Sequence, residues 1–141
     1  MLEATLMDKG TYKDLRVWQE SVKLASNVYR STALFPRHEL YGLSQQMRRA
    51  EVSVPSNIGE GKGHRSNREF ANFLLHARGS LLELQTQILI AQDLQYLPAA
   101  TVSTLISQSD AVARSLNALL NCLRVEPGKT NDQRRTTNDN V

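Results

Sequence analysis

The most constraining feature of the sequence is an apolar repeat that runs through residues 70–91. Ser66 and Glu69 form a capping-box pattern just before it, which predicts where a helix begins. The apolar residues alternate spacings of four and three, as in bundle helices that pack nearly parallel to one another. The repeat therefore predicts a long helix inside a bundle. Its members are Phe70, Leu74, Ala77, Leu81, Leu84, Ile88 and Ala91.

A second apolar stripe accompanies the first on the same helix. This leucine stripe consists of Leu75, Leu82 and Leu89, which recur every seven residues. The two stripes together cover more than one face, so we expect the helix to be buried on two sides. A surplus apolar face of this kind typically marks an interface, which predicts a homo-oligomer that associates through these leucines. The alternative is that this helix lies at the centre of the monomer.

Three further helices are expected from the same period, over residues 14–35, 40–62 and 98–124. The connections between them are short, and short links place neighbouring helices antiparallel. The chain is therefore predicted to be all-α, an antiparallel up-down-up-down four-helix bundle over residues 12–124. A low aromatic content of 6% agrees with this class better than with an all-β fold. The stripe expected for the first helix is Leu15, Trp18, Val22, Ala25, Val28 and Thr32.

The second of these helices contains a proline. Pro55 has no N–H to offer the carbonyl of Glu51, and its ring crowds that turn. The apolar residues nevertheless keep helical spacing on both sides, so we expect a kink at Pro55 rather than the end of the helix. Gly59, Gly61 and Gly63 then predict the helix end. The stripe that keeps its phase is Leu43, Met47, Ala50, Val54 and Ile58.

The glycines around Lys62 raise the question of a phosphate-binding loop. A P-loop requires G-x-x-x-x-G-K-[ST] after a strand. Here Gly61 and Lys62 are followed by Gly63, and the preceding segment is helical. The sequence therefore favours a helix end and a turn over a nucleotide site.

Patterns for metal binding and for nucleophilic catalysis are also lacking. The three histidines, at positions 38, 64 and 76, have none of the spacings that zinc or di-iron bundle sites require. Ser80 and Cys122 lie on apolar helices without a recognisable base. We therefore expect a protein that is not an enzyme and that needs no cofactor or metal.

Positive charge is concentrated in one part of the chain. Residues 37–68 hold six Lys/Arg against three Asp/Glu, which equals the net charge of +3 of the whole chain. Such a segment attracts phosphates, although a solvated helix face is the alternative interpretation. We also expect one of the two adjacent arginines to form a structural ion pair. The candidate nucleic-acid contacts are Arg48, Arg49, Lys62, Arg65 and Arg68.

The ends of the chain carry no targeting pattern. The N-terminus does not resemble a signal peptide, and no apolar run is long enough to span a membrane, which predicts a cytoplasmic protein. Residues 1–11 are expected to be a flexible N-terminus. Residues 125–141 are polar and aperiodic, which predicts a disordered tail.

One motif is long enough to suggest a family. The pattern R-R-A-x-x-S-x-P-S-N-I-x-E-G at residues 48–61 is followed by G-S-L-x-E-L at residues 79–84. From Tyr12 to Leu123 the chain resembles bacterial four-helix bundle proteins encoded in intervening sequences of large-subunit ribosomal RNA genes. It is more distantly similar to the accessory variability determinants of diversity-generating retroelements. Gly59 and Glu51 depart from the family pattern, which has alanine and a small residue there.

The resemblance implies an assembly and a class of partner. It implies a ring-like homopentamer and, from the retroelement relatives, a basic surface that engages a reverse transcriptase and its RNA. It supplies no catalytic residues. The expected function is therefore a non-enzymatic, pentameric scaffold that binds RNA or DNA, or a nucleoprotein partner such as a reverse transcriptase. The alternative is a protein–protein interaction module that binds no nucleic acid.

Overall fold

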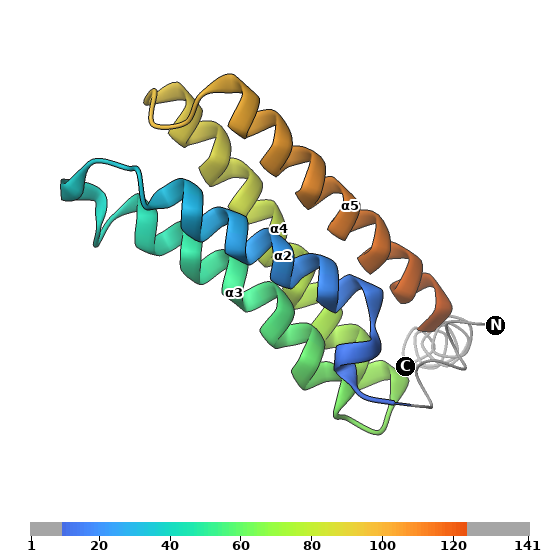
Figure 1. Cartoon of the computed structure of the whole chain (residues 1–141). Helices are drawn as coiled ribbons and strands as arrows, with labels where there is room; N and C mark the ends of the chain where they lie inside the picture. The colour runs from blue at the N-terminus through green and yellow to red at the C-terminus, as the bar shows by residue number, and fades with distance from the viewer. Residues whose placement is uncertain (1–9, 124–141) are drawn as a thin grey trace, which may run out of the picture.

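Four long helices make up most of the described chain, which comprises residues 10–123 of this computed structural model (Figure 1). The all-α prediction is confirmed, since these residues contain no strand. The predictions of a flexible N-terminus over residues 1–11 and of a disordered tail over residues 125–141 lie largely outside the described residues. The elements are η1 (Tyr12–Asp14), α2 (Arg16–Thr32), η2 (Arg37–Glu39), α3 (Leu43–Lys62), α4 (Asn67–Asp93) and α5 (Ala99–Leu123).

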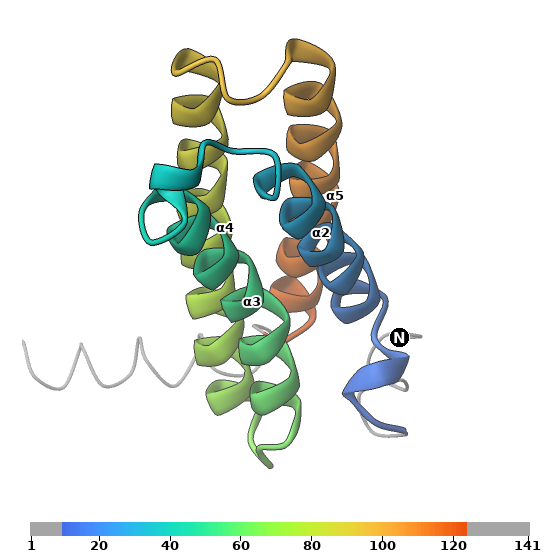
Figure 2. The ribbon, with the colours of Figure 1, turned by 60° about the vertical axis from the view of Figure 1, so that its left-hand side comes forward.

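The four helices surround a common core. Each packs against its neighbour in sequence, and α2 also packs against α5. Figure 2 shows α2 and α5 together on one side of the bundle and α3 and α4 on the other. Along the α3–α4 contact, Gly61 faces Phe73 and the hydroxyl of Ser53 lies 2.9 Å from that of Ser80. Residue numbers therefore rise along α3 as they fall along α4.

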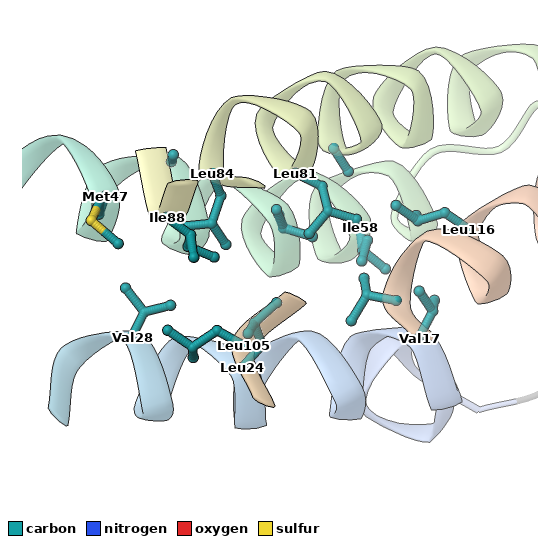
Figure 3. Packing of buried hydrophobic residues seen from close by; sticks show 14 of the residues in the cluster. Val17, Leu24, Val28, Met47, Ile58, Leu81, Leu84, Ile88, Leu105 and Leu116 are labelled. Carbon is teal, nitrogen blue, oxygen red and sulfur yellow. The ribbon is translucent and has the colours of Figure 1, made fainter. Parts of the chain in front are cut away.

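The core is built from aliphatic side chains of all four helices (Figure 3). Every member of the first α4 repeat, from Phe70 to Ala91, is at most 4% exposed, so that prediction is confirmed. Burying one such large side chain contributes on the order of 1.5–3 kcal/mol before entropy is counted. In Figure 3, Leu24 and Val28 of α2 point toward Leu84 and Ile88 of α4.

The stripe predicted for the first helix is confirmed at Leu15, Val28 and Thr32, which are buried. It is wrong at Trp18, Val22 and Ala25, which are only half-buried, because the face with Val17, Ser21 and Leu24 points to the core there. The helix carries apolar residues on two adjacent faces, so spacing alone did not identify the inner one. Ser21 enters the core because its hydroxyl donates to the carbonyl of Trp18, at 2.8 Å. The buried residues are Val17, Ser21, Leu24, Val28 and Thr32.

Two helices begin later than expected because short 3-10 turns precede them. Thr11 and Asp14 form a capping box around η1, so α2 begins only at Arg16. The backbone N–H of Leu43 donates to the carboxylate of Glu39 at 3.1 Å, which places the start of α3 after η2.

Pro55 lies inside α3, which is assigned as one helix from Leu43 to Lys62. The side chain of Asn57 donates to the carbonyl of Ser53 at 2.8 Å and to the Ser53 hydroxyl at 2.9 Å. The buried residues of α3 keep helical spacing on both sides of Pro55, as expected. The kink at Pro55 stays a prediction. No helix of the described chain is long and apolar enough to cross a membrane.

The glycines of α3 have different roles. The helix ends at Lys62 with Gly63 as its C-cap, as expected. Gly59 and Gly61 lie within the helix rather than beyond its end. Gly61 is buried, and a Cβ atom there would lie 2.6 Å from the Cβ atom of Phe73. The absence of a side chain at Gly61 therefore allows α3 and α4 to approach closely.

Candidate functional site

The predicted basic residues do not form one continuous patch. Arg48 and Arg49 lie in the second turn of α3, whereas Lys62 is its last residue. Fourteen residues separate Arg48 from Lys62, which is about 21 Å along a helix. The structure brings Lys62, Arg65 and Arg68 together around the α3–α4 connection, and we call these three residues the basic turn.

Arg48 is engaged with α2. Its Nε donates to the Thr32 hydroxyl at 2.9 Å, and a terminal nitrogen donates to the Tyr29 carbonyl at 3.4 Å. The guanidinium carbon also lies 4.7 Å from the centroid of the Tyr29 ring, a cation–π contact. Three bonding groups on α2 therefore hold this side chain, which leaves little of it for a phosphate.

Arg49 differs from its neighbour. It is exposed and lines a shallow hollow together with Ser53, Ser80 and Glu83. Neither Arg48 nor Arg49 forms an ion pair within residues 10–123, so the expected structural ion pair is wrong. Arg48 has the expected structural role, but its partners are a hydroxyl, a carbonyl and an aromatic ring.

The basic turn is ordered by local contacts. Ser66 caps α4 by accepting from the N–H of Glu69 at 3.1 Å. The capping box is incomplete, because the Glu69 carboxylate accepts from Nδ1 of His64 at 2.6 Å instead of from the Ser66 backbone. The His64 ring stacks on Phe73, with centroids 4.9 Å apart. The Glu69 carboxylate is thus bonded to a histidine rather than to one of the basic residues of this turn.

Of the basic turn, Arg65 and Arg68 are exposed and Lys62 is half-buried. None of the three forms an ion pair with a described residue. The turn therefore presents two exposed guanidinium groups and an ammonium group on a short, ordered connection between two helices.

The leucine stripe of α4 lies on the surface of the single chain. Leu75, Leu82 and Leu89 are 44%, 59% and 52% exposed. The alternative that α4 is the central helix of the monomer is therefore wrong, and only one face of α4 is buried within the chain. The described residues leave about half of each of these three side chains uncovered.

A buried acid in the core was not anticipated. Glu51 is 0% exposed, and neither of its carboxylate oxygens has a hydrogen-bond partner among the described residues. Desolvation raises the pKa of Glu51 from 4.5 to about 9, so the carboxyl is protonated in neutral solution. Its position could have been inferred from spacing, because it follows Met47 by four residues and precedes Val54 by three.

A second unanticipated cluster joins the two connections at the opposite end of the bundle. The Tyr96 hydroxyl donates to Glu39 at 2.8 Å, across 57 residues of sequence. The Leu43 N–H is the main cause that lowers the pKa of Glu39, followed by the Tyr96 bond. The bond to Glu39 in turn raises the pKa of Tyr96. His38 lies at the edge, 3.4 Å from the Tyr96 hydroxyl. We call the Tyr96–Glu39 pair the tyrosine latch.

A groove of about 400 Å³ lies between α2 and α5. No group of three or more His, Cys, Asp or Glu side chains in the described part could hold a metal ion. The α2–α5 groove is lined by Leu15, Arg16, Val17, Glu20, Ala111, Arg114, Ser115, Ala118 and Leu119.

Comparison with known proteins agrees with this architecture. The family model of the 23S rRNA-intervening sequence protein matches residues 13–118. A crystal structure of a protein of unknown function from the S23 ribosomal protein family of Bacteroides thetaiotaomicron VPI-5482 is similar in fold, with a TM-score of 0.67 at 20% identity. The similarity covers 74% of this chain and 97% of that one. No curated protein matches.

The resemblance noted in the sequence is thus supported for the ribosomal RNA branch, whereas similarity to the retroelement accessory proteins stays an expectation. The family match covers most of the bundle, from η1 to the last third of α5. The chain belongs to the 23S rRNA-intervening sequence protein family.

Proposed function

We propose that the chain is a non-enzymatic scaffold that associates with copies of itself and presents basic turns to nucleic acid. The observation that carries the proposal is the exposed leucine stripe, because three large apolar side chains in line on one helix favour a protein interface. A homopentamer is the assembly that the family resemblance implies.

Self-association would place several basic turns on one particle. Each turn supplies three cations that have no acidic partner among the described residues, and guanidinium groups bind phosphates well. These groups would contact phosphates rather than base edges, so sequence preference would be weak. RNA, DNA or a nucleoprotein such as a reverse transcriptase with its RNA is the proposed partner.

Nucleic-acid binding is expected to weaken steeply with salt. Each phosphate that the protein neutralises lowers the slope of log affinity against log salt by about 0.9. We expect Arg65→Ala with Arg68→Ala to weaken binding of a structured RNA and to make that slope shallower by about two. Fluorescence anisotropy between about 50 mM and about 200 mM salt measures both quantities.

Arg37→Ala is the matched control, because it removes an exposed arginine of η2, at the end of the bundle opposite to the basic turn. It should leave the salt slope nearly unchanged. Absence of RNA binding at low salt, or binding that does not depend on salt, would reject the nucleic-acid part of the proposal.

Self-association is expected to depend on the leucine stripe. Leu82→Glu places a charge at its centre, and burying an unpaired carboxylate between two chains is costly. We expect the particle mass from light scattering to fall to that of one chain while the helical circular dichroism signal is retained. His76→Glu, an exposed position elsewhere around α4, should leave the mass unchanged. An unaltered mass in Leu82→Glu would show that the stripe is not the interface.

One observation favours the alternative, a protein-interaction module that binds no nucleic acid. Leu34 and Tyr41 flank η2 and are 85% and 83% exposed, so a second apolar surface lies far from the basic turn. Under this alternative, partner binding survives the combined Arg65→Ala and Arg68→Ala substitutions and is lost when Leu34 and Tyr41 become serine.

A further inference from the structure

We infer that the leucine stripe of one copy docks into the α2–α5 groove of a second copy, so that the chains associate head to tail. This inference rests on the proposed self-association. It specifies which two surfaces of the chain meet in that association and how they recognise each other.

The shape of the groove suits large aliphatic side chains. The α5 side of the groove includes three small residues at intervals of four and three, Ala111, Ser115 and Ala118, beside the larger Arg114 and Leu119. The Ser115 hydroxyl donates to Glu20 at 2.7 Å, which ties α5 to α2 across the groove. The groove is therefore already present in the single chain, and its two sides are fixed relative to each other.

The spacing of the two surfaces also agrees. Leu82 and Leu89 are seven residues apart on α4, which is about 10.5 Å along the helix. Ala111 and Ala118 are separated by the same number of residues on α5. Two leucines of one copy can thus lie over two alanines of the other when the helices run side by side, with neither helix distorted.

Charge favours the same pairing. The exposed charged residues beside Leu82 and Leu89 on α4 are Glu83 and Asp93, and Arg78, whose guanidinium donates to Asn117 of α5 at 3.1 Å.

The groove contributes the opposite charge, from Arg16 and Arg114. Its acid, Glu20, lies 3.7 Å from Arg16 in an ion pair and also accepts from Ser115. Opposite charges that surround an apolar contact steer association and fix its register.

Stripe and groove lie on different surfaces, so each copy keeps one of each available after the first contact. Repetition of such a contact closes into a ring or extends into a filament.

The test uses two variants that each disable one surface. Leu82→Glu removes the stripe and keeps the groove, whereas Ala118→Trp fills the groove and keeps the stripe. Ala118 is exposed, so the larger side chain does not enter the core. Asn121→Trp is the matched control, because it puts the same indole at another exposed position of α5, outside the groove lining.

We expect each variant alone to scatter light as a single chain and an equimolar mixture to form a particle of two chains. The intact stripe of one variant then binds the intact groove of the other, and no further copy can add. Asn121→Trp should assemble like the unaltered chain. Circular dichroism checks folding, and Arg114→Glu replaces Ala118→Trp if the latter does not fold.

Two results would overturn the inference and leave the scaffold in place. One is normal assembly of a folded groove variant, and the other is a mixture that stays monomeric although the unaltered chain assembles. A monomeric unaltered chain would instead reject the proposed self-association itself.

Discussion

Replacing Glu51 with glutamine is expected to stabilise the folded chain, by an amount that grows with pH. The carboxyl is fully buried and has no hydrogen-bond partner among residues 10–123, and its pKa rises from 4.5 to about 9 on folding. Between these values the unfolded chain releases the proton and the folded chain keeps it. The free energy of unfolding therefore falls as pH rises, by about 1.4 kcal/mol per pH unit.

The sign follows from the direction of the shift. Below the ordinary pKa of 4.5 the Glu51 carboxyl is protonated in both the folded and the unfolded chain, so the stability of the folded chain is then highest with respect to this group. That stability is lost progressively as pH rises and is gone above the folded pKa of about 9. Glutamine keeps the shape but has no proton to release, so the gap between the two proteins should widen by several kcal/mol over this window.

Urea unfolding at a series of pH values measures the effect. Glu60→Gln is the matched control, because it removes an exposed carboxylate from the same helix, and its difference from the unaltered chain should vary little with pH. A pH-independent difference for Glu51→Gln would mean that Glu51 is ionised in the folded chain and has a partner.

Gly61→Ala is expected to destabilise the bundle by about 2 kcal/mol, although alanine is the better helix former. The new Cβ would lie 2.6 Å from the Phe73 Cβ and 3.0 Å from a Phe70 ring carbon. Because a Cβ position is fixed by the backbone, α3 and α4 must move apart, and the packing lost exceeds the gain in helix propensity.

Gly79 provides the opposite case on the partner helix. Beyond the local backbone of α4, a Cβ atom there would meet no atom of the described residues within 4 Å, so Gly79→Ala should stabilise by about 1 kcal/mol. Thermal or urea unfolding of both variants in the Leu82→Glu background excludes any contribution from association. Equal effects of the two substitutions would mean that α3 and α4 do not approach closely at Gly61.

Whether the sequence predicts the buried face of a helix depends on how many of its faces are apolar. In α4 the alternation of spacings four and three identified the inner face, and all members of that repeat are buried, whereas the leucine stripe on the second apolar face is exposed. In α2 two adjacent faces are apolar, and spacing favoured the one with Trp18 although the one with Leu24 is inside. Packing against the other helices decides between such faces, and that information is not local.

The candidate surfaces were predictable only in part. The leucine stripe followed from its period of seven, and the basic residues from composition. Arg48 and Arg49 are adjacent and point about 100° apart, so the sequence did not say which one packs on Tyr29. Glu51 was left out of the α3 stripe, although its spacing from Met47 and Val54 places it on the buried face.

The tyrosine latch has a consequence for how the bundle opens. The bond from Tyr96 to Glu39 ties the α2–α3 connection to the α4–α5 connection, and Glu39 also holds the first N–H of α3. Neither connection can fray without releasing the other, so these segments should exchange their amide hydrogens as one cooperative unit. At the opposite end, the bond from His64 to Glu69 joins the α3–α4 connection only to the first turn of α4, so that connection can open while the Tyr96–Glu39 end stays closed.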